Sequence, residues 1–247
     1  MKLSVFFTPA GVTPAVLANK PVLVVDLLRA TTTIITALAN GARAVLPAAT
    51  SSDALGLAQN LERKDLLLAG ERNALPIEGF ALGNSPLEMT AERVGGKTLV
   101  MATTNGTSAL LAAEDAKPVL LGAAVNFSAA VEAARRALDA AGELVILCAG
   151  RQGQFALEDA YAAGRFALAI LPGGARSGAE LNDAAIAARD LVKRYGAKWK
   201  SAVLASAAAR DLRAKGFRAD VEAATQADVY AVVPTLEQRQ VRLRPGG

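Results

Sequence analysis

Short apolar runs alternate with longer amphipathic stretches through the first two thirds of the chain. The runs are rich in Val, Leu and Ile and predict strands at residues 3–7, 22–25, 44–46, 66–69, 98–102, 119–121 and 144–147. The stretches between them predict helices near 31–40, 51–63, 107–114 and 126–140, one starting at Ser85 and one from about 156. This alternation is typical of βαβ units and predicts a three-layer α/β/α fold with a mainly parallel or mixed central sheet.

The pattern changes after residue 172. Residues 178–195 and 202–215 predict helices, and only residues 229–233 predict a strand. The chain contains neither an internal repeat nor a low-complexity linker. We therefore predict one domain over residues 1–247, with a soft subdivision near residue 172 and a smaller helical half after it.

The stretch 22–38 organises the prediction of a functional site. Asp26 directly follows the apolar run 22–25, and a carboxylate cannot stay charged inside an apolar layer without a partner. We therefore expect Asp26 at the carboxyl end of the strand, where the sheet opens. Arg29 follows three residues later, and the threonines at 31–33 are candidate caps of the next helix. An acid, a base and free helix amides in one place suit an anion, a metal ion, or both.

Three other predicted strands also end in polar turns, at residues 70–72, 103–107 and 148–153. The carboxyl ends of parallel strands share one edge of a sheet, which is where ligands bind in α/β folds. We therefore expect these three turns and Asp26 to lie around one site.

The turn 103–107, Thr-Thr-Asn-Gly-Thr, is a candidate oxyanion site. Its small side chains let backbone amides approach an anion, but Thr and Asn also cap many ordinary helices, so the turn alone leaves both interpretations open. Arg29 and Arg151 at the same edge favour the oxyanion site, because Arg binds phosphate or sulfonate bidentately. We therefore assign Asp26, Arg29 and Arg151 to catalysis. Substrate binding is assigned to Arg72, Thr103, Thr104, Asn105, Gly106 and Thr107.

Four carboxylates are candidate ligands of Mg²⁺, which binds carboxylates together with waters and substrate phosphate. They are Asp26, Glu71, Glu158 and Asp159, chosen from a set of candidate carboxylates that also includes Glu78. Glu158 and Asp159 would also suit the start of any helix, and Glu71 would suit a surface ion pair with Arg72. Because all four are expected near one edge of the sheet, we predict a magnesium site there.

The chain has no histidine and one cysteine, Cys148. The lack of histidine excludes a Ser-His-Asp triad, a phosphohistidine and a His-ligated zinc, which leaves acid–base chemistry to other side chains or metal-bound water. Cys148 lacks the arginine six positions on that a cysteine phosphatase needs, since Gln154 stands there, and we expect a buried, inert thiol. A single cysteine excludes an internal disulfide framework and suits a reducing cytoplasm, where we place the protein.

The 27 basic and 23 acidic residues give a formal net charge of +4. Lys and Arg are scattered and lack interleaved aromatics, so we predict small anionic substrates and no nucleic-acid partner. The basic groups at 210–218 and 239–244 are expected to be a solvated helix face and a frayed terminus. No apolar run approaches the roughly 18 residues of a membrane span, and we predict no membrane partner.

Five motifs together resemble the 2-phosphosulfolactate phosphatase family. They are Val-Val-Asp-Leu-Leu-Arg-Ala-Thr-Thr-Thr from residue 24, Gly-Glu-Arg from 70, Glu-Gly-Phe-Ala-Leu-Gly-Asn-Ser-Pro from 78, Thr-Thr-Asn-Gly-Thr from 103, and Cys-Ala-Gly-Arg-Gln-Gly from 148, the last followed by Glu158-Asp159 and Ala163-Gly164. The resemblance spans roughly residues 1–233. The family often has Asp where this chain has Ala81.

The resemblance implies an α/β/α fold and Mg²⁺-dependent hydrolysis of (R)-2-phospho-3-sulfolactate to (R)-3-sulfolactate and phosphate, a step of coenzyme M biosynthesis. The expected partner is thus a small phosphorylated, sulfonated acid. A homodimer is one possible oligomeric state. Two alternatives stay open. One is a haloacid-dehalogenase-like phosphatase that forms an aspartyl-phosphate on Asp26, although Leu28 stands where its second Asp would be. The other is a non-catalytic module that binds small anions.

Overall fold

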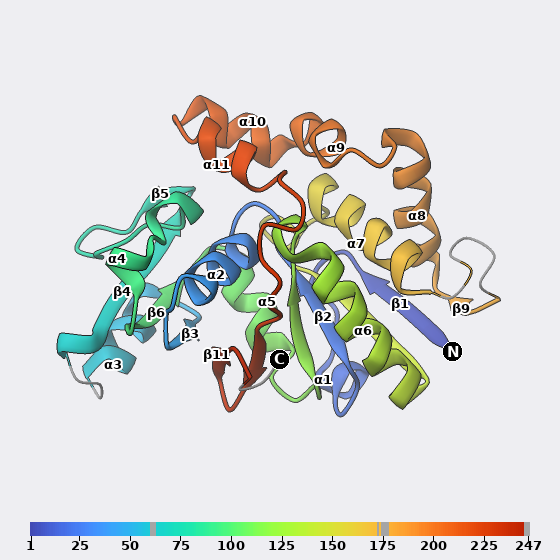
Figure 1. Ribbon diagram of the computed structural model, residues 1–247, viewed down its shortest axis with the longest axis horizontal. Helices are drawn as coiled ribbons and strands as arrows, with labels where there is room; N and C mark the ends of the chain where they lie inside the picture. Colours follow the sequence, from blue (N-terminus) through green and yellow to red (C-terminus); the bar gives the residue numbers. More distant parts are fainter. Residues whose placement is uncertain (60–62, 172, 174–177, 245–247) are drawn as a thin grey trace.

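The computed structural model describes residues 1–59, 63–171, 173 and 178–244. At its centre lies a mixed sheet of 11 strands, with helices packed around it in three α/β/α layers (Figure 1). The strands are β1 (Lys2–Phe6), β2 (Val22–Val25), β3 (Ala44–Ala48), β4 (Leu66–Arg72), β5 (Leu75–Pro76), β6 (Thr98–Ala102), β7 (Val119–Gly122), β8 (Glu143–Cys148), β9 (Glu180–Leu181), β10 (Thr235–Glu237) and β11 (Gln240–Arg242). Their order in the sheet is β5-β4-β6-β3-β11-β10-β7-β2-β8-β1-β9.

The sheet consists of two parallel blocks joined by a hairpin. Strands β4, β6 and β3 pair in parallel, and so do β7, β2, β8, β1 and β9. The antiparallel hairpin β10–β11 lies between the blocks, where β11 pairs with β3 and β10 pairs with β7. The chain's last strands therefore complete the middle of the sheet, and the predicted mixed sheet is confirmed.

Strand β2 is the central strand of the larger block. Its four residues, Val22–Val25, are fully buried, and each pairs with both β7 and β8. A continuous run of apolar, mostly β-branched residues suits a strand that is covered on both faces. The strand ends where Asp26 begins the turn into the next helix, as the sequence predicts.

The helices match the predicted alternation with strands. They are α1 (Pro14–Leu17), α2 (Ala30–Ala39), α3 (Ser51–Gln59), α4 (Ala91–Val94), α5 (Gly106–Ala112), α6 (Phe127–Ala141), α7 (Leu157–Ile170), α8 (Asp183–Tyr195), α9 (Trp199–Ala205), α10 (Ala207–Ala214) and α11 (Arg218–Ala223). Short 3₁₀ turns occur at η1 (Arg63–Asp65), η2 (Pro86–Glu88) and η3 (Ala124–Asn126). None of the helices in the described part of the chain is long and apolar enough to span a membrane.

Helices α9, α10 and α11 form an arm that crosses one end of the sheet, along the top of Figure 1. The sequence predicts one helix over 202–215, but the structure breaks it at Ser206. The backbone of Ser206 is extended, at φ −75° and ψ 156°, and its hydroxyl accepts a hydrogen bond from the amide of Ala209 at 3.1 Å, which caps α10. This break lets the arm bend, so that α10 points toward the carboxyl ends of the strands.

Several boundaries differ from the predictions for local reasons. The helix predicted over 178–195 starts at Asp183, because residues 180–181 pair with β1 and Asn182 caps the helix through the amide of Ala185. Ser85 starts only the 3₁₀ turn η2, since Glu88 accepts from the amide of Gly83 instead of completing a capping box. The helix predicted to end near residue 63 ends at Gln59, and residues 60–62 lie outside the described residues, as does residue 172, the predicted subdivision.

The prediction of a strand at 229–233 is wrong, and so is that of a frayed basic terminus. Residues 231–234 form no regular strand, and they hydrogen-bond to the chain around η3, where the Asn126 amide donates to the carbonyl of Val232 at 2.9 Å. The following residues form the β10–β11 hairpin instead, with Val241 fully buried. Short strands of this kind carry too little pattern of their own to be recognised locally.

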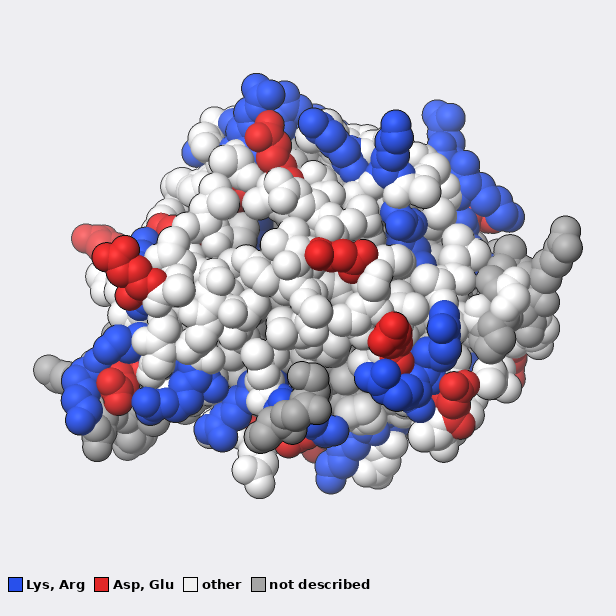
Figure 2. Space-filling view, in the orientation of Figure 1, with Lys and Arg blue, Asp and Glu red and all other residues white. Residues whose placement is uncertain are grey.

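Basic side chains occur along the upper and lower edges of the face shown in Figure 2, and its middle is largely uncharged. The upper group lies over the arm α9–α11 and over α8, and the lower group is mixed with Asp and Glu. On this face the cations are thus spread along the edges, in line with the scattering that the sequence indicates.

Candidate active site

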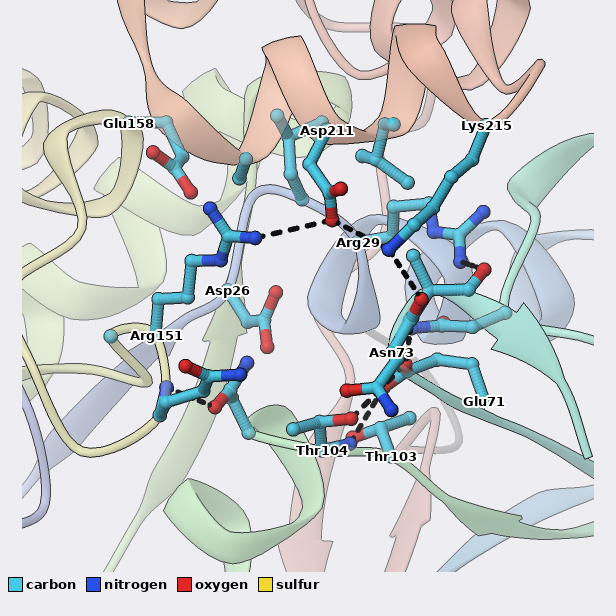
Figure 3. Close-up of a pocket in the computed structure, with 18 residues that line it drawn as sticks. Asp26, Arg29, Glu71, Asn73, Thr103, Thr104, Arg151, Glu158, Asp211 and Lys215 are labelled. Atoms are coloured by element: carbon cyan, nitrogen blue, oxygen red, sulfur yellow. Dashed lines mark hydrogen bonds and ion pairs between the residues drawn. The ribbon is translucent and has the colours of Figure 1, made fainter.

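A pocket of about 240 Å³ lies where the carboxyl ends of the strands meet α10 (Figure 3). Turns after β2, β4, β6 and β8 contribute to it, which places the four predicted polar turns around one cavity. The residues that line it are Asp26, Leu28, Arg29, Glu71, Asn73, Ala74, Asn84, Thr103, Thr104, Asn105, Gly150, Arg151, Gln152, Glu158, Ala208, Asp211, Leu212 and Lys215.

Asp26 is one of three buried acids that line this pocket, and its side chain lies near the centre in Figure 3. Its Oδ1 accepts a hydrogen bond from the amide of Ala30 at 3.1 Å, at the start of α2. Gly106 lies against its other oxygen: a Cβ at that position would stand 2.6 Å from Oδ2 and 2.3 Å from the Cβ of Ala30. The Thr-Thr-Asn-Gly-Thr turn therefore needs glycine so that it can approach Asp26.

The environment of Asp26 favours its protonated form. Burial raises the pKa of Asp26 to about 7, and repulsion by Glu158 and Glu71 acts in the same direction, against the amide of Ala30 and the charge of Arg29. Burial likewise raises the pKa of Glu158, although a hydrogen bond with Ser206 and the nearby Arg151 oppose this shift. We call Asp26 and Glu158 the acidic pair.

Glu71 is occupied in holding two turns together. Its Oε1 accepts from the Thr104 amide at 2.6 Å, and its Oε2 accepts from the Thr104 hydroxyl at 3.1 Å and the Ala74 amide at 2.7 Å. These bonds attach the turn after β6 to the β4–β5 hairpin. Arg72 does not line the pocket, and its guanidinium donates to the backbone carbonyls of Glu71 and Ala49. The Glu71 carboxylate is therefore held by Thr104 and Ala74, and the alternative of an ion pair with the Arg72 side chain does not apply.

Asp159 lies behind the pocket wall and does not line it. Its Oδ1 accepts from the Leu27 amide at 2.9 Å and its Oδ2 from the Gly150 amide at 3.1 Å, so it connects the turns after β2 and β8. Burial raises its pKa, and repulsion by Asp26 and Glu158 adds to the effect. Cys148 is fully buried beside it, as predicted, and burial also raises the pKa of that thiol.

The turn 103–107 divides between pocket and core. Thr103, Thr104 and Asn105 line the pocket, whereas Gly106 and Thr107 do not. Thr107 is buried, and the two threonines cap each other: the amide of Thr107 donates to the Thr103 hydroxyl at 3.0 Å, and the Thr103 amide donates to the Thr107 hydroxyl at 3.2 Å. Thr107 thus shapes the turn instead of facing a ligand.

Arg29 borders the pocket, but its charge is neutralised by Asp220 on α11. Nη1 lies 2.6 Å from Asp220 Oδ2 with both side chains almost fully buried, and Nη2 donates to the carbonyl of Ala74 at 2.8 Å. The guanidinium also stacks on the Phe217 ring at 4.5 Å. Arg29 therefore fastens the arm to the sheet. The oxyanion role that the sequence suggests for it stays a prediction.

Arg151 is held at the tip of a tight turn after β8. Its amide and carbonyl both bond to Gln154, and Gly150 before it has φ +67°, where a Cβ would stand 2.4 Å from the Gln154 carbonyl oxygen. The Gln152 amide donates to Asn105 Oδ1 at 2.7 Å, which ties this turn to the turn after β6. The side chain of Arg151 then reaches Asp211 on α10.

Sequence reasoning missed five polar residues of the pocket: Asn73, Asn84, Gln152, Asp211 and Lys215. Asn84 is buried, and its Oδ1 has no hydrogen-bond partner among the described residues. Asp211 and Lys215 lie four residues apart on one helix face, a spacing that in the sequence indicates only a surface ion pair. Only the folded arm brings them to the pocket.

The carboxylates do not form a ready-made metal cage. Among the described residues, no three Asp, Glu or Cys side chains lie together in a group that could hold a metal ion. Of the four predicted ligands, Asp26, Glu71 and Glu158 line the pocket, but Glu71 and Asp159 already accept backbone hydrogen bonds with both oxygens. Of the predicted ligands in the pocket, Asp26 and Glu158 are therefore the carboxylates that could bind a cation.

The fold and this pocket define an α/β protein with a small, acidic active-site cavity at the carboxyl ends of its strands. The family model of 2-phosphosulpholactate phosphatase matches residues 6–239. The chain belongs to the 2-phosphosulfolactate phosphatase family, whose name denotes hydrolysis of a phosphoric monoester.

Individual relatives agree with this assignment over most of their length. A probable 2-phosphosulfolactate phosphatase of Caldanaerobacter subterraneus subsp. tengcongensis is 37% identical over 242 residues, which is 98% of each chain. A probable 2-phosphosulfolactate phosphatase of Symbiobacterium thermophilum is 38% identical over 92% of this chain and 95% of its own. Another from Clostridium novyi is 42% identical over 76% of this chain and 77% of its own.

Proposed function

We propose that this protein is a Mg²⁺-dependent phosphatase that hydrolyses (R)-2-phospho-3-sulfolactate to (R)-3-sulfolactate and phosphate. The observation that carries the proposal is the acidic pair, buried at the carboxyl ends of the strands and flanked by Arg151, in a member of this family. A cytoplasmic location, a place in coenzyme M biosynthesis and a homodimer stay predictions from the sequence.

Mg²⁺ suits the acidic pair. It commonly binds through one or two carboxylates and keeps waters and substrate phosphate as its other ligands, so a cage of three carboxylates is not needed. Burial raises the pKa of both Asp26 and Glu158, so their charged forms lack the stabilisation that water would give, and a divalent cation would supply it. We therefore propose these two as the ligands; when bound, the metal supplies positive charge to the phosphoryl oxygens.

The other residues of the pocket would hold the substrate. A cavity of about 240 Å³ admits an ester of only a few carbon atoms. In the proposed reaction a water molecule attacks phosphorus and the P–O bond to C2 of sulfolactate breaks. One proton of the water ends on the C2 oxygen and the other on phosphate. Leu28 lines the pocket two residues after Asp26, and an apolar side chain there cannot serve as the general acid of an aspartyl-phosphate mechanism.

Phosphate release from synthetic 2-phosphosulfolactate tests the proposal. We expect release with Mg²⁺, loss of release after EDTA treatment, and recovery when Mg²⁺ is added back. A non-catalytic anion-binding module would bind the ester and release no phosphate under any of these conditions, and activity that resists EDTA would contradict the metal requirement.

A further inference from the structure

The mouth of the pocket carries three charged side chains in a row, Arg151, Asp211 and Lys215, which we call the mouth cluster (Figure 3). Asp211 Oδ2 accepts from Arg151 Nη2 at 3.1 Å and from Lys215 Nζ at 3.0 Å. Lys215 also donates to the carbonyl of Asn73 at 2.8 Å, on the opposite wall. Each of the three side chains is about one third exposed, so a ligand can reach them.

Charge is distributed unevenly between the interior of the pocket and this mouth. Inside are the acidic pair and Glu71, and the one buried cation, Arg29, is neutralised by Asp220. The mouth cluster holds two cations against one carboxylate. Among the residues that line the pocket, the positive charge that an anion can use is therefore at the mouth.

We propose that Arg151 and Lys215 bind the sulfonate group of the substrate, with Asp211 as the residue that positions both. This inference rests on the proposed function and names the part of the site that recognises the second anion. The ester phosphate would lie inward, beside the acidic pair and its cation, and the sulfonate would lie outward.

The chemistry of a sulfonate suits this arrangement. Its three oxygens point in different directions and stay unprotonated, so it can accept from a guanidinium and an ammonium that approach from two sides. Asp211 holds the two donors next to each other before the ligand arrives, which lowers the entropy lost on binding.

The competing explanation is that Lys215 merely fastens the arm to the β4–β5 hairpin through the Asn73 carbonyl. A matched pair of substrates separates the two: 2-phosphosulfolactate and 2-phospholactate differ only in the sulfonate. We expect Lys215→Met to lower the ratio of their kcat/KM values by about tenfold or more, mainly through KM for the sulfonated ester. In the control Lys193→Met, whose ammonium pairs with Asp190 on exposed α8, the ratio should stay unchanged.

Equal losses on both esters would show that Lys215 is a structural fastening and would overturn the proposal. If Lys215→Met instead lowered the ratio of 2-phospholactate to glycerol 2-phosphate, the cluster would recognise the carboxylate and the sulfonate assignment would be wrong. Binding of 3-sulfolactate and of lactate, measured by calorimetry, keeps the inference testable even if no ester is hydrolysed. Tighter binding of 3-sulfolactate that Lys215→Met abolishes would support it; equal binding of both acids would contradict it.

Discussion

The acidic pair and the mouth cluster use the same kinds of charged group in opposite ways. Burial disfavours the charged forms of Asp26 and Glu158, and repulsion by Glu158 adds to this effect on Asp26, so keeping them in the pocket lowers stability. Asp211 and Lys215 lie where water screens them, and their ion pair adds little to stability. In the roles that we propose, the groups for chemistry lie where burial disfavours their charge, and the groups for selectivity lie near water and carry a net positive charge.

The largest expected effect is on the acidic pair. Asp26→Asn keeps the volume of the side chain but removes the charge that a cation or phosphoryl group requires. We expect kcat/KM for 2-phosphosulfolactate and 2-phospholactate alike to fall by about 10³-fold or more, close to 4 kcal/mol. Asp139→Asn, on the exposed face of α6, is the control that should stay active. Retention of a tenth of the activity by Asp26→Asn would contradict the role of the acidic pair.

The next effect concerns Arg29, which the structure places between pocket and arm. Arg29→Met leaves Asp220 buried without its partner, and we expect the free energy of unfolding in urea to fall by about 3–5 kcal/mol. Arg136→Met, which breaks an exposed pair with Glu132, should change it by less than about 1 kcal/mol. Unchanged stability with reduced activity would return Arg29 to the oxyanion role.

A smaller effect is expected from adding one methyl group beside Asp26. Gly106→Ala forces a Cβ against Asp26 and Ala30 and should lower the free energy of unfolding by about 1–3 kcal/mol, with lower activity. Gly56→Ala is the matched control in α3, since nothing lies within 4 Å of its added Cβ and alanine favours a helix. Equal stabilities of the two variants would show that the turn has room to move.

The last prediction concerns the dependence of stability on pH. The pKa of Asp26 is about 7 in the folded protein and that of an unfolded Asp is about 4, so between these values the folded state binds more protons. Stability should therefore fall as pH rises from about 4 to 7 without Mg²⁺, by up to about 1.4 kcal/mol per pH unit from this group. Subtracting the curve of Asp26→Asn isolates it; parallel curves would mean that Asp26 titrates normally.

Much of the fold was predictable because its information is local. Runs such as Val22–Val25 and Thr98–Ala102 bury both faces and contrast sharply with the polar turns that follow them. The placement of Asp26, Thr103 and Arg151 around one pocket follows from strand ends alone. Their proposed chemical roles, including Mg²⁺ binding, stay predictions.

What the sequence could not reveal depends on contacts between distant segments. Arg29 pairs with Asp220, which lies 191 residues later in the sequence, and this ion pair uses the charge of Arg29 to hold the arm. From the sequence, Asp211 and Lys215 are expected to form only a solvated ion pair on a helix surface. In the structure, the break at Ser206 places α10 over the pocket, and both side chains line it. The sequence around Asn84 does not predict a role for its side chain, because the cavity that Asn84 lines is formed by several other segments of the chain.

The β10–β11 hairpin has a consequence for how the protein is made. Val241 pairs with Val45 and Leu236 with Val119, so within the sheet the two blocks are connected through residues 235–242, which follow both blocks in the sequence. Until those residues leave the ribosome, β3 and β7 each present an open edge, the kind of surface on which strands of other chains can add. Contacts this distant in sequence also form slowly. We therefore expect the exposed edges of β3 and β7 to be the part of the newly made chain that needs chaperones for longest.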